Sequence, residues 1–176
     1  SFYNYDLLLF KTTWLLNYSL LFGAVLGLLN IKYLKNARLG KPNLLFNCLF
    51  ILFFLGMGLP ELSALRESYL KQDLAQYYER GWNHITFRYV CYAFAAFNLY
   101  ICDRYFKQDF MESKYKNHFE LFLYGTLLCI SSYELIHIME LAHSSQSDKL
   151  GLSILWEVYS LLLIALSNSP IILLSS

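Results

Sequence analysis

The sequence predicts an all-α fold: a polytopic bundle of about five transmembrane helices with one amphipathic helix at the membrane surface. Of the 176 residues, 57% are hydrophobic and only 15% are charged, against about 25% charged in a typical soluble domain. The hydrophobic residues form runs close to the roughly 20 residues that cross a bilayer. One run, at 43–59, is apolar on every side, which requires lipid or a large protein around it.

Composition and charge exclude several other classes of protein. The 14 Lys and Arg nearly balance the 13 Asp and Glu, so no nucleic-acid partner is expected through gross basicity. High hydrophobicity excludes disorder, and the few Gly and Pro residues exclude a collagen-like chain. The lipid bilayer is therefore the first expected partner, although a very apolar soluble bundle is the alternative.

The predicted spans lie at 12–30, 43–59, 84–102, 119–139 and 150–166. Pro60 is expected to stop the second span, and Pro170 to break or kink the chain after the fifth. Residues 1–10 resemble the end of an earlier helix. We therefore expect residues 1–176 to form one transmembrane domain, a fragment of a larger protein with further membrane helices in the same or a partner chain.

A further helix is predicted at 61–80, where Leu and Tyr residues recur at helical spacing. Pro60 suits its start, Gly81 suits its end, and Trp82 suits a membrane interface. We expect this helix to lie on the outer surface. It serves either as a cap packed over the bundle or as a lid over a site below it.

The basic residues of the loops predict an orientation with the N-terminus outside. The loops after the first and third spans lie on one side of the membrane and hold eight of them: Lys32, Lys35, Arg38, Lys41, Arg104, Lys107, Lys114 and Lys116. The opposite side holds five: Lys11, Arg66, Lys71, Arg80 and Lys149. The first side is therefore expected to be cytoplasmic.

Three charged residues fall within the spans, where each requires a partner or a wet cavity. At ~1.5 Å per residue, Arg88 and Glu134 each lie about 7 Å from the middle of their spans, and Glu157 about 3 Å. Because successive spans alternate in direction, all three fall in the outer half, and Asn17 lies at a similar level. This buried charge layer is either an ion pair that fixes helix packing or a site for proton or substrate coupling.

The run from Glu134 to His143 alternates Glu and His every three residues. Glu-x-x-His is a metal-binding spacing in di-iron bundles, which take one such motif from each of two helices, whereas this chain has the spacing only within this one run. His137 and Glu140 remain helix neighbours as a candidate metal pair. The alternative is a helix end whose polar groups reach the interface. The four cysteines form no C-x-x-C pair and are interpreted as small buried hydrophobic residues.

Three stretches, at 59–70, 87–94 and 152–166, carry a family resemblance. An outer helix precedes a span bearing Arg88 and Tyr89, and a later span has the pattern Ser153-x-x-Trp156-x-x-Tyr159. In these features the chain resembles the large, many-helix bacterial membrane proteins of unknown function, in particular their Bacteroidetes members. The resemblance implies a bacterial inner membrane location. It carries over no activity, cofactor or functional residue, so these stay unknown.

Three functions are consistent with these patterns. The first is a structural or scaffold membrane subunit whose buried charge layer locks the helices together. The second is a transporter or proton-coupled component that uses Arg88, Glu134 and Glu157. The third is a membrane-embedded enzyme with a site near His137 and Glu140.

Overall fold

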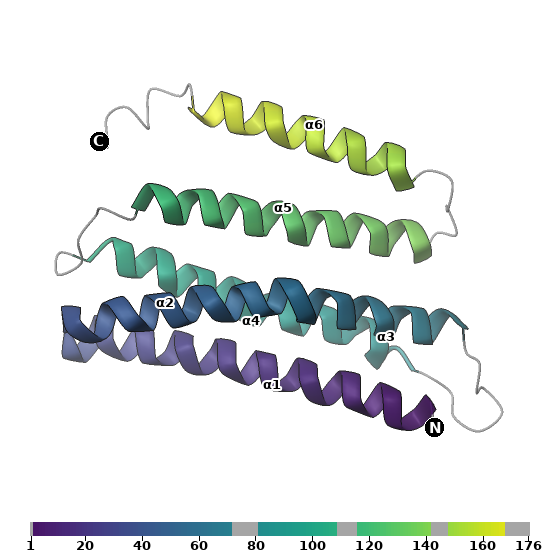
Figure 1. The fold of residues 1–176 in the computed structure, drawn as a ribbon, viewed down its shortest axis with the longest axis horizontal. Helices are drawn as coiled ribbons and strands as arrows, with labels where there is room; N and C mark the ends of the chain where they lie inside the picture. The colour runs from purple at the N-terminus through teal and green to yellow at the C-terminus, as the bar shows by residue number, and fades with distance from the viewer. Residues whose placement is uncertain (1, 72–80, 109–115, 142–147, 168–176) are drawn as a thin grey trace. The chain divides into compact units, whose positions relative to one another are not determined.

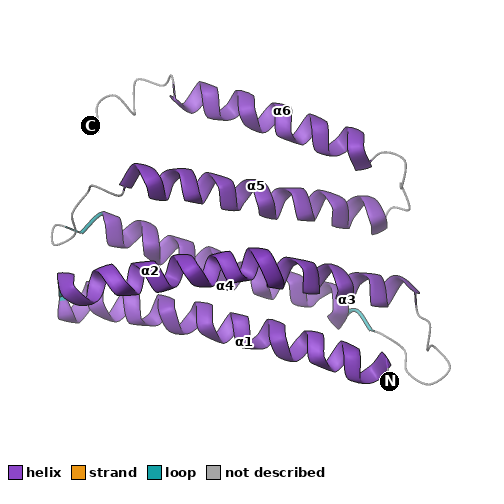
Figure 2. Cartoon of the chain, in the orientation of Figure 1, coloured by secondary structure: helices purple, strands orange, loops and turns teal. Residues whose placement is uncertain are grey.

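The structure, a computed structural model, describes residues 2–71, 81–108, 116–141 and 148–167 (Figure 1). These residues are almost entirely helical, and no strand occurs among them (Figure 2). The predicted all-α class is therefore confirmed. The chain divides into two compact units, residues 1–126 and 127–176.

The helices follow the predicted spans closely. Six α-helices and two π-helical segments occur in the described chain: α1 (Phe2–Leu29), η1 (Asn30–Leu34), α2 (Ala37–Phe53), η2 (Phe54–Gly58), α3 (Leu59–Lys71), α4 (Asn83–Phe106), α5 (Lys116–Leu141) and α6 (Asp148–Ser167). Four helical stretches are long and apolar enough to cross a membrane by length and composition: Leu7–Leu34, Ala37–Lys71, Asn83–Phe106 and His118–Leu141. The fifth predicted span corresponds to a shorter apolar stretch, Leu150–Ile164.

The helix does not end at Pro60 as the sequence suggests. Helices α2 and α3 are joined through η2 into one helical stretch, Ala37–Lys71, and Leu59 N–H donates to the carbonyl of Phe54, five residues back. The next residue, Pro60, has no N–H to donate, and the helical stretch continues past it. The predicted surface helix at 61–80 is therefore, as far as Lys71, the continuation of α2; residues 72–80 lie outside the described chain.

Small residues on α1 allow its two neighbours to approach closely. Ala24 is fully buried. A methyl group added at Gly23 would overlap the Asn47 amide oxygen on α2, and one at Gly27 would lie 2.7 Å from Ile101 on α4. Residues with small side chains at i and i+4 are a common contact between membrane helices. Gly23 thus allows α2 to pack closely on α1, and Gly27 allows α4 to pack closely on α1.

Aromatic contacts set the direction of α4 and the start of α5. Trp14, near the middle of α1, packs on Phe87 at the start of α4, with ring centroids 5.0 Å apart. Gly27, near the end of α1, packs on Ile101, near the end of α4, so these two helices run parallel. At the other end of α4, the rings of Phe106 and Phe119 lie 4.8 Å apart. The first half of α5 therefore packs against α4 within the first unit.

The second unit pairs the end of α5 with α6. Gly151 lies against Met139, whose sulfur would be 3.0 Å from a methyl group at that glycine. Trp156 Nε1 donates to Ser132 Oγ at 3.1 Å. The packing of the Met139 side chain on Gly151 and one interhelical hydrogen bond thus join the two helices.

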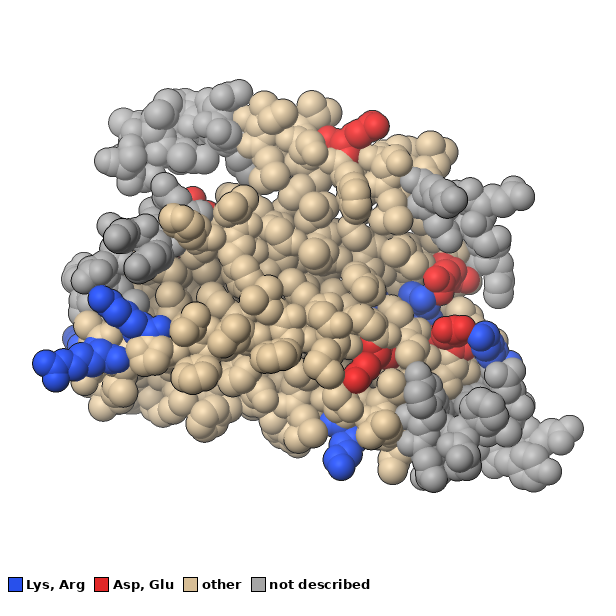
Figure 3. All heavy atoms as spheres, in the orientation of Figure 1, with Lys and Arg blue, Asp and Glu red and all other residues tan. Residues whose placement is uncertain are grey.

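The surface carries many large apolar side chains. Phe22, Leu15 and Tyr18 on α1 and Leu45, Phe46 and Leu52 on α2 are each more than half exposed. Over α1 and α2, the middle of the surface lacks charged side chains, and Lys and Arg gather at the end where the two helices join (Figure 3). This pattern suits helices whose middle faces hydrocarbon and whose ends face water.

Candidate functional site

Three polar contacts in the first unit link α4 to α1, η1 and α2, and we call them the polar ladder: Asn17–Cys91, Asn47–Asn98 and Asn30–Tyr105. Their members on α4 are seven residues apart, and they belong to a buried face with alternating spacings of four and three: Cys91, Ala95, Asn98, Cys102 and Tyr105. At ~1.5 Å per residue, the contacts follow one another about every 10 Å along the bundle.

The middle contact connects all three helices. Asn98 Nδ2 donates to the Leu20 carbonyl on α1 at 2.9 Å and to Asn47 Oδ1 on α2 at 2.8 Å. Asn47 Nδ2 in turn donates to the Gly23 carbonyl at 3.3 Å and to Asn43 Oδ1 at 2.5 Å. Asn47 and Asn98 are both fully buried. Buried amides cost free energy unless they are hydrogen-bonded, so these bonds fix the three helices to one another.

A second contact closes the turn between α1 and α2. Asn30 Nδ2 donates to Tyr105 Oη at 2.7 Å and to the Asn36 carbonyl at 3.0 Å. The Asn36 N–H donates back to Asn30 Oδ1 at 3.0 Å. Asn36 is also the N-cap of α2, since its side chain accepts from the Arg38 N–H at 2.9 Å. One asparagine therefore holds both the turn and the end of α4.

The third contact lies near Arg88. Asn17 Nδ2 donates to Cys91 Sγ at 3.2 Å, one turn of α4 beyond Arg88, so Asn17 and Arg88 lie at similar levels. Arg88 is only 1% exposed. Its Nε donates to Tyr92 Oη at 2.8 Å, and its guanidinium lies 5.7 Å from the centre of the Tyr92 ring. Part of the buried charge is therefore stabilised within α4 itself.

The other residues of the predicted charge layer belong to the second unit. Glu134 is partly buried on α5, and Glu157 is exposed on α6, where it lines a shallow hollow with Trp156, Ser160 and Leu161. The pairing of Arg88 with either glutamate stays a prediction.

The candidate metal pair also lies on α5. His137 is buried and Glu140 is partly buried. No group of three or more His, Cys, Asp or Glu that could hold a metal ion occurs among residues 2–71, 81–108, 116–141 and 148–167. The described part of the chain thus supplies at most this pair, and metal sites normally use more protein ligands.

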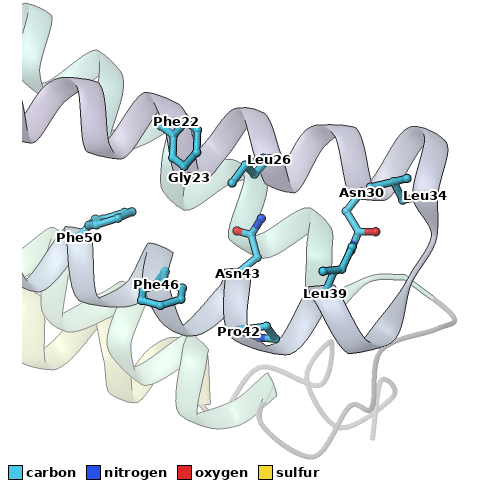
Figure 4. Close-up of a pocket in the computed structure, with 10 residues that line it drawn as sticks. All are labelled: Phe22, Gly23, Leu26, Asn30, Leu34, Leu39, Pro42, Asn43, Phe46 and Phe50. Atoms are coloured by element: carbon cyan, nitrogen blue, oxygen red, sulfur yellow. The ribbon is translucent and has the colours of Figure 1, made fainter.

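An apolar groove runs between α1 and α2, and we call it the α1–α2 groove (Figure 4). Its volume is about 400 Å³. Its walls are mostly Phe and Leu, and Asn43 extends from α2 toward α1 (Figure 4). The residues around it are Phe22, Gly23, Leu26, Asn30, Leu34, Leu39, Pro42, Asn43, Phe46 and Phe50.

This geometry defines a class, a helical bundle with an apolar exterior and buried amides between its helices. Comparison with protein-family models, with curated proteins and with solved structures gives no match. The resemblance to the many-helix bacterial membrane proteins stays a prediction.

Of the asparagines in the polar ladder, only Asn17 was predicted from the sequence. Ionised side chains are the most costly groups in hydrocarbon, so the prediction rested on them and did not include the neutral amides. Asn47 and Asn98 lie inside predicted spans and Asn30 at the end of one, so their positions alone were a usable signal. The partners Cys91 and Tyr105 had no such signal, because nothing in their residue type distinguishes them from ordinary core residues.

Proposed function

We propose that this chain is a structural or scaffold subunit of a larger integral membrane assembly. One observation carries the proposal: the buried amides of the polar ladder donate to groups on neighbouring helices. Polar groups used in this way hold helices together and do not present chemistry to a substrate. The apolar exterior of the helices supports the membrane location.

Extraction of membranes at alkaline pH tests the location. We expect the full chain to stay with the lipid pellet after carbonate treatment, which strips peripheral proteins from membranes. Recovery of the chain in the supernatant would contradict an integral membrane protein.

We further propose a bacterial inner membrane with the N-terminus outside. The excess of Lys and Arg in the loops after the first and third spans supports this orientation. The hydrogen bond between Asn30 and Tyr105 joins the bases of those two loops in the first unit, so their basic residues count toward the same side of the membrane. A membrane-impermeant maleimide should label Trp82→Cys in intact cells and Lys35→Cys only after lysis, with the parent chain as the background. The reverse pattern would invert the orientation.

The transporter alternative is favoured by one specific observation, the nearly complete burial of Arg88. An ionisable residue inside a membrane helix is by default a candidate functional group. Proteoliposomes that hold the full chain and a trapped pH dye distinguish the two functions. A scaffold shows the proton flux of empty liposomes, whereas flux that is lost in Glu157→Gln would replace the scaffold proposal with proton coupling.

A further inference from the structure

We propose that the α1–α2 groove binds an acyl chain of an anionic phospholipid and that the adjoining turn binds the phosphate of its headgroup. The turn is defined by Lys32, Lys35, Arg38 and Lys41, and we call it the basic turn. The inference rests on the membrane location proposed above and adds a ligand to it.

The shape and lining of the groove suit a hydrocarbon chain. Along α1 and η1 the groove reaches from Phe22 to Leu34, about 18 Å at ~1.5 Å per residue. Its volume of about 400 Å³ lies within the range of ~300–1,000 Å³ typical of ligand pockets. Leu26 and Phe46, which line it, are 42% and 55% exposed. The groove therefore opens to the surroundings of the bundle, and an acyl chain can enter from the side.

The charge around the groove selects an anionic ligand. Residues 7–60 contain five Lys and Arg and no Asp or Glu, and four of the five form the basic turn. Leu34 and Leu39, which line the groove, lie within this turn, and the Lys35 and Arg38 side chains are exposed. Clustered Lys and Arg at the end of membrane helices bind the phosphates of anionic lipids.

The backbone at Lys35 gives an independent indication. This residue has φ 46° and ψ 38°, the left-handed conformation, in which glycine is the favoured residue after a helix. It is the one positive-φ residue in the described part of the chain. A lysine here strains the backbone and places a cation beside the mouth of the groove, which is a reason to expect that its charge is used.

A second copy of this chain is a less suitable occupant. A dimer with its two-fold axis along the membrane normal would bring two basic turns to the same level. Like charges placed together oppose association. A lipid phosphate instead neutralises them.

Native mass spectrometry of the full chain in detergent tests the proposal with two probes that share the same oleoyl chains. Phosphatidylglycerol is anionic, and phosphatidylcholine is zwitterionic. We expect one phosphatidylglycerol to bind at least about fivefold more tightly, the effect of one lysine near a lipid surface. Equal binding of the two lipids would overturn the proposal.

Two variants separate the headgroup contact from the groove. Lys35→Gly should weaken phosphatidylglycerol binding about fivefold, while the denaturation midpoint stays level or rises because the strain is relieved. Leu26→Trp should fill the groove and abolish binding. The matched controls are Lys11→Gln, near the start of α1, and Leu15→Trp, an exposed leucine that does not line the groove; both should bind like the parent.

Unchanged binding in Lys35→Gly or in a folded Leu26→Trp would overturn the site. If Leu26→Trp does not fold, Lys35→Gly still decides, since it is expected to fold at least as well as the parent. A chain that resists carbonate extraction but shows no lipid preference refutes the lipid site alone. A chain that carbonate releases refutes the membrane location as well.

Discussion

At the scale of single residues, amides and glycines on neighbouring helices depend on one another. Asn98 is bonded to both α1 and α2, and Asn47 reaches the Gly23 carbonyl because that residue has no side chain. A change at either position therefore affects a contact among three helices. Substitutions at Asn98 and Gly23 lead to different predictions, because a change at Asn98 removes a hydrogen-bond donor and a change at Gly23 adds side-chain volume.

Asn98→Leu should destabilise the bundle by about 1–2 kcal/mol. The variant removes two interhelical bonds, and such bonds average ~0.6 kcal/mol in membrane proteins with a maximum near ~1.7. Denaturant unfolding in detergent measures the change. Thr86→Val is the control, because the Thr86 hydroxyl is exposed and bonds within its own helix. A loss equal to that of the control would refute a role for this contact in packing.

Gly23→Ala should cost about 1–3 kcal/mol, the usual range for overpacking. The new methyl group would overlap the Asn47 amide oxygen, so the amide must move and its bond to Asn98 is lost. Gly125→Ala is the matched control, since nothing lies within 4 Å of a methyl group there. The Gly125→Ala control should raise stability by roughly 0.5–1 kcal/mol, because it removes a mid-helix glycine without adding a clash. Similar midpoints for the two variants would mean that α1 and α2 are not in close contact at Gly23.

At the scale of elements, the helices were largely predictable from hydropathy. The predicted span 84–102 lies within α4, 119–139 lies within α5, and 150–166 lies within α6. The junction at Pro60 was not predictable in the same way. The effect of a proline depends on which carbonyl its missing N–H would have met, and the π-helical turn before it, with Leu59 bonded to Phe54, has no signature in the sequence.

Asn36→Ala should weaken the start of α2 by about 1 kcal/mol, since an N-cap side chain satisfies an otherwise unbonded N–H. Asn36→Ser should recover most of the loss, because serine also caps well. Hydrogen exchange at the Arg38 amide reports the local effect. If alanine and serine variants exchange equally fast, the side-chain cap contributes little and the Asn30 bonds hold the turn.

At the scale of the whole molecule, the residues of the predicted charge layer are divided between the two units. Asn17 and Arg88 lie at similar levels within the first unit, whereas Glu134 and Glu157 lie in the second. The depth of a residue in a span follows from its position in the sequence. The partner of that residue depends on how helices are arranged around one another, which hydropathy does not encode.

A double-mutant cycle tests the predicted pair of Arg88 and Glu134. If they are partners, Arg88→Gln and Glu134→Gln should each destabilise the protein by up to ~3–5 kcal/mol, the cost of leaving one buried charge alone. The double variant should then lose much less than the sum of the two. Additive losses on denaturation would remove this pairing, and the same cycle with Glu157→Gln tests the other glutamate.

The polar ladder has a consequence for how the nascent chain enters the membrane. Asn17 and Asn30 find their partners 74 and 75 residues later in the sequence, and Asn47 finds Asn98 51 residues later. At a synthesis rate of ~5–20 residues per second, the contacts with α4 form on the order of 3–15 s after the asparagines are made. During that interval Asn30 and Asn47 can bond to partners in α1, α2 and the turn between them, whereas the Asn17 amide needs a temporary host, such as the lateral gate of the insertion machinery. Slow translation before α4 would prolong this vulnerable period.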